Sequence, residues 1–350
     1  MTSLAEWYSP TEVRHGILPA WLTFALLEQA RWAARGGLDA DRRALAVQMA
    51  ALSRAAADNP GAWFPREWPP EELIGAGPGN RRVATPYTKA MTAFPAVDMA
   101  AANILATVQQ ADAWGVPEDR RVHLRGSAFA RDASHVAGRE DLGSSTAMRR
   151  ATRRALEMAG LELDQIDAFD LYSCFGAAVF FARDALGLDI DDPRPVTLTG
   201  GLPYHGGPGS NYMSHSISHA VESIRRGEHT NVMVTGVGMH MTKHVAAVWS
   251  AEPGAPRPDS YPPQQAALGG DPVEVAEEAT ATGLIQAATV VFDRADRPDH
   301  AVAIVRLPDG RRCYARSTRS PVIDAVVEGK WVGATVDLSA GPDGTNDFTF

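Results

Sequence analysis

Three stretches of this 350-residue chain concentrate the residue types that carry acid–base or nucleophilic chemistry. They are residues 170–181 (DLYSCFGAAVFF), 199–220 (TGGLPYHGGPGSNYMSHSISHA) and 234–244 (VTGVGMHMTKH). Each follows a predicted strand, and the first two run into a predicted helix. In open α/β sheets ligands bind at the carboxyl ends of strands, and helix N-termini offer free N–H groups to a carbonyl oxygen or an anion. We therefore expect a ligand site where these stretches meet.

Cys174 is a candidate nucleophile because it opens a predicted helix directly after a strand. The positive end of a helix can lower the pKa of a cysteine thiol. Most lone cysteines, however, are small apolar residues of the core. Position alone leaves both interpretations open.

Six of the ten histidines lie between residues 205 and 244, and five of these are candidates: His205, His215, His219, His240 and His244. An imidazole titrates near neutral pH, so one of them can act as a general base. His215 and His219 are spaced to share a metal on one helix face, but no H-E-x-x-H motif or third ligand accompanies them. For any single histidine, a structural hydrogen bond in a loop is the alternative. We expect a proton-handling histidine and no metal site.

The second stretch is also a glycine-rich loop, with five glycines between Gly200 and Gly209. Glycines allow a backbone to approach a ligand closely. The loop lacks both the G-x-G-x-x-G pattern of dinucleotide sites and the G-K-S/T ending of a phosphate-binding loop. We therefore expect this loop to face a ligand, but not as a dinucleotide-binding or phosphate-binding loop.

The elements that position these residues alternate between helices and strands. Apolar spacing predicts helices within residues 16–57 and over 96–111, 146–159, 174–187 and 211–225. Short apolar runs predict strands over 121–130, 166–171, 197–199 and 231–236. This alternation is typical of α/β layering with buried strands. Residues 60–95 are turn-rich, and a connection of that length usually has a function or covers another element.

The last part of the chain has a different character. Residues 252–272 are rich in proline and glycine and predict a domain boundary. Strands are expected at 289–292, 301–306, 312–315, 330–338 and 347–350, with one helical turn near 322–327. Asp309-Gly310 between two of them indicates a hairpin. This tail predicts a small all-β barrel or sandwich.

Composition excludes several classes of protein. The 42 acidic and 33 basic side chains give a net charge of −9, which argues against a general nucleic-acid or acidic-membrane binder. Two cysteines exclude a disulfide framework and a cysteine-rich zinc site, and suit a reducing compartment. The first residues show no signal peptide, and no run reaches the roughly 18–20 apolar residues of a membrane span. We expect a soluble, cytoplasmic protein.

Several strings in combination resemble the thiolase superfamily, most closely the sterol-carrier-protein-type and actinobacterial thiolase-like acetyl-CoA acetyltransferases. They include HGILPAWLTFALLEQA, ADNPGAWF, NRRVATPYTKAM, DLYSCFG and TGGLPYHGGPGSNYMSHSI. The tail TVVFDRADRPDHAVAIVRLPDGRRCYA is similar to the extra C-terminal domain of type 1 thiolase-like proteins. The resemblance implies a layered αβαβα fold with an incomplete first half. Its expected parts are a partial first half (1–120), a second half (121–255), a linker (256–272) and a β-rich C-terminal domain (273–350).

The resemblance also implies acyl-CoA chemistry at helix ends between the halves, with a nucleophilic cysteine, a proton-handling cysteine or histidine, and oxyanion holes. At the matching positions Tyr172 stands where the family orients an oxyanion with Asn or His, and Gly207 replaces the histidine of G-H-P. No cysteine lies near residues 236–238. Gly16 onward matches the middle of the first half, so the turn with the nucleophilic cysteine has no counterpart.

Three functions follow as hypotheses, and whether the chain is an enzyme stays open. The first is a thiolase-like acyltransferase of lipid or steroid side-chain metabolism in a longer or multi-subunit assembly. The others are a non-catalytic acyl-CoA-binding or scaffolding subunit, and a retro-aldol lyase on a steroid-type CoA thioester. A coenzyme A thioester is the expected substrate, with no permanently bound cofactor. The expected partner is a second copy, a thiolase-like protein or a small β-barrel protein.

The residues expected to serve these functions fall into two groups. Catalytic roles are assigned to His215, Tyr172, Cys174 and His244: proton transfer to His215, Tyr172 or His244, with Cys174 as the candidate nucleophile. Substrate contacts are assigned to Gly206, Gly207, Ser210, Asn211 and Ser173.

Overall fold

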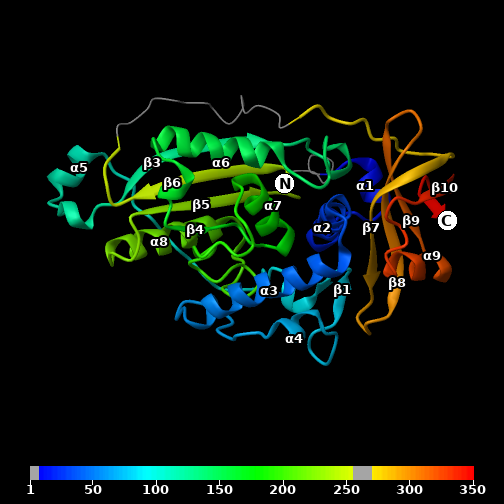
Figure 1. Ribbon diagram of the computed structural model, residues 1–350, viewed down its shortest axis with the longest axis horizontal. Coiled ribbons are helices and arrows are strands. Elements are labelled where there is room, and N and C mark those ends of the chain that lie inside the picture. Colours follow the sequence, from blue (N-terminus) through cyan, green and yellow to red (C-terminus); the bar gives the residue numbers. More distant parts are fainter. Residues whose placement is uncertain (1–7, 255–269) are drawn as a thin grey trace.

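Two sheets organise the computed structural model, which describes residues 8–254 and 270–350 (Figure 1). The first has the order β3–β6–β5–β4 and consists of β3 (His123–Arg131), β4 (Ala168–Asp170), β5 (Asn231–Gly238) and β6 (Lys243–Ser250). β4 and β5 are parallel, whereas β6 is antiparallel to both β5 and β3. Three of the predicted strands are thereby confirmed.

The strand predicted at 197–199 is wrong as a regular element. The chain there runs beside β4, where Phe169 N–H donates to Pro195 O (2.8 Å) and Leu171 N–H to Val196 O (2.9 Å). The pairing stops at Thr197, because the next backbone N–H groups donate to a side chain of β4 described below.

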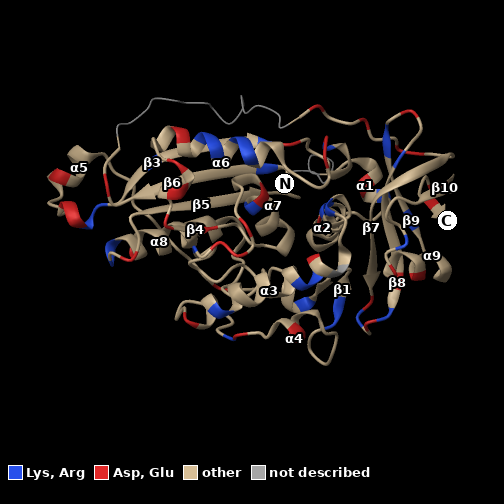
Figure 2. Ribbon diagram, in the orientation of Figure 1, with Lys and Arg blue, Asp and Glu red and all other residues tan. Residues whose placement is uncertain are grey.

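Helices cover both faces of this sheet, with α6 (Thr146–Ala159) on one side and α8 (Tyr212–Arg225) on the other (Figure 1). α6 is strongly amphipathic: small residues such as Ala147, Ala151 and Ala155 face the sheet. Its outer face carries a row of arginines, visible as the blue band on α6 in Figure 2: Arg149, Arg150, Arg153 and Arg154. Gly160, in the left-handed conformation, ends the helix.

Five further helices come from residues 10–74 and from the segment that follows β4. They are α1 (Pro10–Arg14), α2 (Ala20–Arg35), α3 (Leu38–Ala57), α4 (Pro70–Ile74) and α7 (Gly176–Leu186). α2 is buried from Leu22 to Trp32 because it packs against α7 and also against the second sheet. Buried Arg31 of α2 forms two hydrogen bonds with Asp184 of α7 (2.6 and 3.0 Å), which satisfy its charge. Short 3-10 turns occupy Lys89–Met91, Glu118–Arg120, Val136–Gly138, Leu163–Gln165 and Gly209–Asn211.

The second sheet confirms the predicted β-rich tail. It contains β7 (Thr282–Phe292), β8 (Pro298–Arg306), β9 (Arg312–Ser317), β10 (Thr335–Ala340) and β11 (Asn346–Thr349), with α9 (Ser320–Val327) packed on it. Two short strands of the turn-rich region, β1 (Arg82–Ala84) and β2 (Tyr87–Thr88), join this sheet through the pair Ala84–Val291. Local patterns did not reveal this long-range pairing.

The helix predicted over 96–111 is largely wrong, since only α5 (Val108–Ala113) forms. From Val97 to Ile104 the chain is extended, with odd positions partly covered and even positions exposed. Ala101 N–H donates to Asn211 Oδ1 (2.9 Å), and the Asn211 amide donates back to Ala101 O (3.1 Å). Asn103 Nδ2 donates to Ser214 O (3.0 Å). These contacts outweigh the high helix propensity of the alanines, because tertiary contacts override intrinsic propensity.

The predicted linker over 256–272 falls mostly outside the described residues. In the described part of the chain, no helix combines the length and the apolar character needed to cross a membrane.

A close approach between β3 and α6 gives a test of this packing. A Cβ built on Gly126 would lie 2.2 Å from Ala155 O, so Gly126→Ala must push helix and strand apart. We expect it to lower the free energy of unfolding by about 1–3 kcal/mol. Urea unfolding measures this, with Gly77→Ala as the control because a Cβ there meets nothing within 4 Å. Equal effects of the two substitutions would contradict the packing.

Candidate active site

The first two predicted stretches meet at the N-termini of α7 and α8. The Tyr172 ring packs edge-on against Tyr212, with centroids 5.5 Å apart. A Cβ on Gly201 would come within 2.8 Å of Ser173 Oγ, so the glycine loop lies directly on the strand–helix turn. The His205 ring in turn contacts Tyr212, with centroids 6.1 Å apart. The structure therefore brings these two stretches into one site.

The third stretch reaches the same neighbourhood through α2. His240, in the turn between β5 and β6, shares a hydrogen bond with Thr23 Oγ1 (2.5 Å). The adjacent Phe24 stacks on Phe175 at the start of α7, with centroids 4.7 Å apart. The turn thus lies behind the strand–helix turn, on its α2 side.

Asp170, the last residue of β4, holds the first two stretches together. Its fully buried carboxylate accepts hydrogen bonds from Leu198 N–H (2.8 Å), Thr199 N–H (3.0 Å), Thr199 Oγ1 (3.0 Å) and Ser216 Oγ (2.6 Å). These donors connect the end of β4 to the glycine loop and to the first turn of α8. The sequence analysis did not select Asp170, although an acidic residue ending a buried strand is a usable signal.

Asn59, which follows α3, joins the histidines to the glycine loop. Its Nδ2 donates to Thr199 O (2.8 Å) and to His219 Nε2 (2.9 Å), and lies 3.2 Å from His205 Nδ1. His205 Nε2 lies 3.3 Å from His215 Nδ1. Asn59 was also missed, because its only sequence signal is the loop-forming Asn-Pro pair.

Donors and acceptors in this cluster determine where the proton of His215 lies. Because the Asn59 NH₂ group carries hydrogens and no free lone pair, a proton on His205 Nδ1 would point at them, and we therefore assign the proton of His205 to Nε2. That Nε2–H donates to His215 Nδ1. His215 therefore carries its own proton on Nε2, which is buried and has no hydrogen-bond partner among the described residues.

Burial controls the charge state of these groups. It lowers the pKa of His205 to about 4, with smaller contributions from His219 and His215. Burial and then His219 also lower the pKa of His215. Burial and then Cys174 raise the pKa of half-buried Tyr172. At pH 7 the site thus presents a neutral imidazole and a protonated phenol.

The histidines form no metal site. Within residues 8–254 and 270–350, no group of three or more His, Cys, Asp or Glu side chains is placed to hold a metal ion. The imidazole nitrogens of His205 and His219 are instead occupied by Asn59, His215 and backbone oxygen.

Cys174 lies at the predicted strand–helix turn, but its thiol is buried. It is 8% exposed, and burial raises the pKa of its thiol rather than lowering it. Desolvation of the charged form thus outweighs the effect of the α7 N-terminus. Cys313, within β9, is fully buried, and burial raises its thiol pKa to about 12. Both cysteines are free thiols, and neither is present as a thiolate at pH 7.

A buried carboxyl group lies next to the α7 N-terminus. Glu28 of α2 accepts hydrogen bonds from Tyr87 OH (2.8 Å) and Trp32 Nε1 (3.0 Å), and Tyr87 OH accepts from Ala177 N–H (3.2 Å). A Cβ on Gly176 would lie 3.2 Å from Glu28 Oε2. Burial raises the pKa of Glu28 to about 7. A glutamate within the apolar run LTFALLEQA was the overlooked signal.

His244 is placed in a different cluster. It lies fully buried in β6, 3.0 Å from Asp132 Oδ2 and 3.2 Å from Ser145 Oγ. Burial opposes ionisation of Asp132, but the hydrogen bond with His244 and the charge of Arg139 lower its pKa to about 2. Ser145 caps α6, so this cluster joins β3, β6 and the start of α6. The structure does not bring His244 together with Tyr172.

The five residues predicted to contact substrate have different environments: Gly206, Gly207, Ser210, Asn211 and Ser173. Both glycines are buried: Gly207 N–H donates to Phe94 O (3.0 Å), and a Cβ on Gly206 would lie 2.6 Å from Met99 Sδ of the extended segment. Asn211 bonds to the same segment, as described above. Ser210 is exposed, and Ser173 is buried beside the glycine loop.

Glu28 makes stability depend on pH in a defined direction. Its folded-state pKa of about 7 exceeds the ordinary value of 4.5, so its contribution is fully present below about pH 4.5 and is lost as the pH rises through 7. From pH 5 to pH 8 we expect the free energy of unfolding to fall by about 1–3 kcal/mol relative to Glu28→Gln. Urea unfolding of both proteins, with exposed Glu118→Gln as control, checks this. A pH-independent difference would contradict it.

The two thiols are expected to resist alkylation. Because both are buried and protonated, iodoacetamide at pH 8 should leave Cys174 and Cys313 unmodified in the folded protein and modify both in urea. Mass spectrometry of the two cysteine peptides measures this. Rapid modification of Cys174 in the folded protein would contradict this expectation and would support Cys174 as a nucleophile.

Comparison with known proteins agrees with this architecture. The family described as the thiolase-like protein type 1 additional C-terminal domain matches residues 263–345. A crystal structure of a monomeric SCP2-thiolase-like protein type 1 from Mycobacterium smegmatis is similar, with a TM-score of 0.87 and 34% identity over 98% of this chain and 75% of that chain. The resemblance and the thiolase-like α/β fold expected from the sequence are confirmed. The chain therefore belongs to the type 1 SCP2-thiolase-like proteins of the thiolase superfamily.

Proposed function

We propose that this protein acts on a coenzyme A thioester by stabilising the enolate that forms when a carbon–carbon bond beside the thioester carbonyl breaks. The single observation that carries the proposal is the buried Nε2–H of His215 in the first turn of α8, which has no hydrogen-bond partner within residues 8–254 and 270–350. A buried donor without a partner is costly unless a ligand oxygen completes it. A thioester oxygen that becomes negative in the transition state is such an acceptor.

Tyr172 supplies the proton transfer that this chemistry also needs. Its raised pKa keeps the phenol protonated, so it can give a proton to the enolate carbon. In a retro-aldol cleavage the electron pair of the C2–C3 bond becomes the enolate. As the phenol protonates C2, the resulting phenolate takes the proton of the C3 hydroxyl in the same step, and C3 becomes a carbonyl. His215 polarises the thioester oxygen throughout.

The buried thiols favour this lyase reaction over acyl transfer through an enzyme thioester. Acyl transfer of that kind needs a thiolate, and the pKa values of Cys174 and Cys313 are both raised. Retro-aldol cleavage needs only hydrogen-bond donors and a proton-exchanging group. A 3-hydroxyacyl-CoA, including one with a steroid side chain, is the substrate class of this proposal, and the free thiols suit a reducing, cytoplasmic setting.

Thiolase-type acyl transfer is the second candidate, supported by membership of the type 1 SCP2-thiolase-like family. In that case the nucleophilic cysteine comes from outside these 350 residues, in a longer chain or in a heteromeric assembly, because Cys174 and Cys313 are both buried and protonated. His215 keeps the same role, because acyl transfer of the thiolase type also passes through a thioester enolate.

Substitution at the two donors tests the proposal. With 3-hydroxyacyl-CoA substrates, His215→Ala should lower kcat/KM about 10²–10³-fold by removing the oxyanion donor, and Tyr172→Phe at least about 10²-fold. His215→Gln retains an N–H donor and should recover part of the loss. Mass spectrometry of the two cleavage products measures turnover, and calorimetry should show thioester binding within a few-fold of wild type.

The control is His229→Gln, since His229 bonds to Ser223 near the far end of α8. This variant should keep wild-type turnover. Thioester binding without turnover by the wild-type protein would overturn the lyase proposal and support a binding or scaffolding subunit. If free coenzyme A cleaved an acyl-CoA thioester only after a partner chain was added, that result would instead support acyl transfer.

A further inference from the structure

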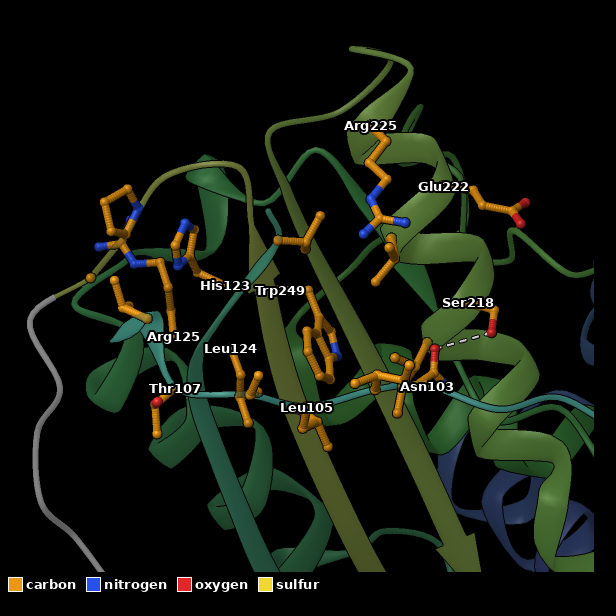
Figure 3. Close-up of a pocket in the computed structure, with 18 of the residues that line it drawn as sticks. Asn103, Leu105, Thr107, His123, Leu124, Arg125, Ser218, Glu222, Arg225 and Trp249 are labelled. Atoms are coloured by element: carbon orange, nitrogen blue, oxygen red, sulfur yellow. Dashed lines mark hydrogen bonds between the residues drawn. The ribbon is translucent and has the colours of Figure 1, made fainter. Parts of the chain in front are cut away.

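A groove of about 880 Å³ opens between α8 and β3, toward the opposite end of α8 from His215 (Figure 3). One wall is the second half of α8, from Ile217 to Arg225, and the other is the start of β3 with residues 102–108. Trp249 of β6 lies between the walls (Figure 3). Nothing in the proposed thioester chemistry uses this groove.

Apolar side chains dominate its lining: Leu105, Val108, Val122, Leu124, Ile217, Val221 and Trp249. Trp249 is only 5% exposed, whereas Leu105 is 70% and the neighbouring Ile104 88% exposed. Such an exposed apolar patch beside a concave surface is typical of a binding site. The volume lies in the range of about 300–1,000 Å³ that small-molecule sites occupy.

Two buried donors in the groove have no partner. Trp249 Nε1–H and Arg125 Nε–H are both shielded from water without a hydrogen bond in the described residues. Buried donors are normally satisfied, so an acceptor that enters the groove would remove an unfavourable term. The groove therefore suits a ligand that carries an acceptor oxygen.

The charges around the groove favour an anion. Arg125 and Arg225 lie on opposite sides of Trp249 (Figure 3), and neither pairs with a carboxylate in the described part of the chain. Each instead donates to a backbone oxygen, Arg125 to Ala159 O and Arg225 to Arg120 O, both at 2.9 Å. Glu222, the acidic lining residue, lies 3.9 Å from Arg226. The unpaired charges of the lining are thus positive.

We propose that this groove binds an organic anion that joins an apolar chain to a carboxylate, of the fatty-acid class. The apolar chain covers Leu105, Leu124 and Ile217, and the carboxylate accepts from Trp249 Nε1–H and from an arginine. The proposal is independent of the thioester chemistry at His215. It would stand if that chemistry were absent.

Calorimetry with dodecanoate tests the proposal, with dodecan-1-ol and acetate as matched probes that lack the charge and the chain. Dodecanoate should bind at least about tenfold more tightly than either. The double variant Arg125→Gln/Arg225→Gln should raise its Kd about tenfold, and Trp249→Phe about fivefold. Circular dichroism and thermal unfolding of each variant confirm that it is folded.

The control is Arg149→Gln, because Arg149 is an exposed arginine on α6, across the sheet from the groove. It should change the Kd less than twofold. Absence of dodecanoate binding, equal binding of dodecan-1-ol, or equal effects of the control and the groove variants would overturn the proposal. Turnover of 3-hydroxyacyl-CoA is measured in parallel, and its loss alone leaves the groove proposal intact.

Discussion

The carboxylate of Asp170 is fully buried, and an ionised group in that position must be surrounded by donors. It obtains them from four residues: Thr197, Leu198 and Thr199, which lead into the glycine loop, and Ser216 of α8. The loop and the first turn of α8 cannot move from the end of β4 without leaving that charge unsatisfied. Since His215 directly precedes Ser216, the position of its imidazole depends on this one carboxylate.

The site shows how environment, more than residue type, decides chemistry. Cys174 stands at a helix N-terminus, where a thiol pKa is often lowered, yet its burial has the larger effect. His215 is held neutral by burial and receives a hydrogen bond from His205, so it is a directed donor rather than a charged group. Family membership accounts for the fold, whereas the reaction depends on these local arrangements.

Tertiary contacts also shape the segment that leads from the site to the groove. Residues 97–104 are extended because Asn211 and Ser214 supply hydrogen bonds that a helix would lose. The same segment covers Gly206 and continues into the wall of the groove. One stretch of chain thus borders both proposed binding regions, although they lie at different ends of α8.

The sequence by itself determined the alternation of helices and strands, the β-rich tail, the family and the meeting of the first two stretches, which hold Tyr172 and His205. The helices, strands and family motifs depend on residues that lie close together in the sequence, so periodicity and motif spacing reveal them. Only the tertiary structure decided the roles of Asp170, Asn59 and Glu28 and the placement of His244. The partners of these residues lie far away in the chain: Asn59 and Thr199 are 140 positions apart, and His244 and Asp132 are 112 apart. Burial and long-range hydrogen bonds arise only when such distant segments pack together, and no local pattern records them.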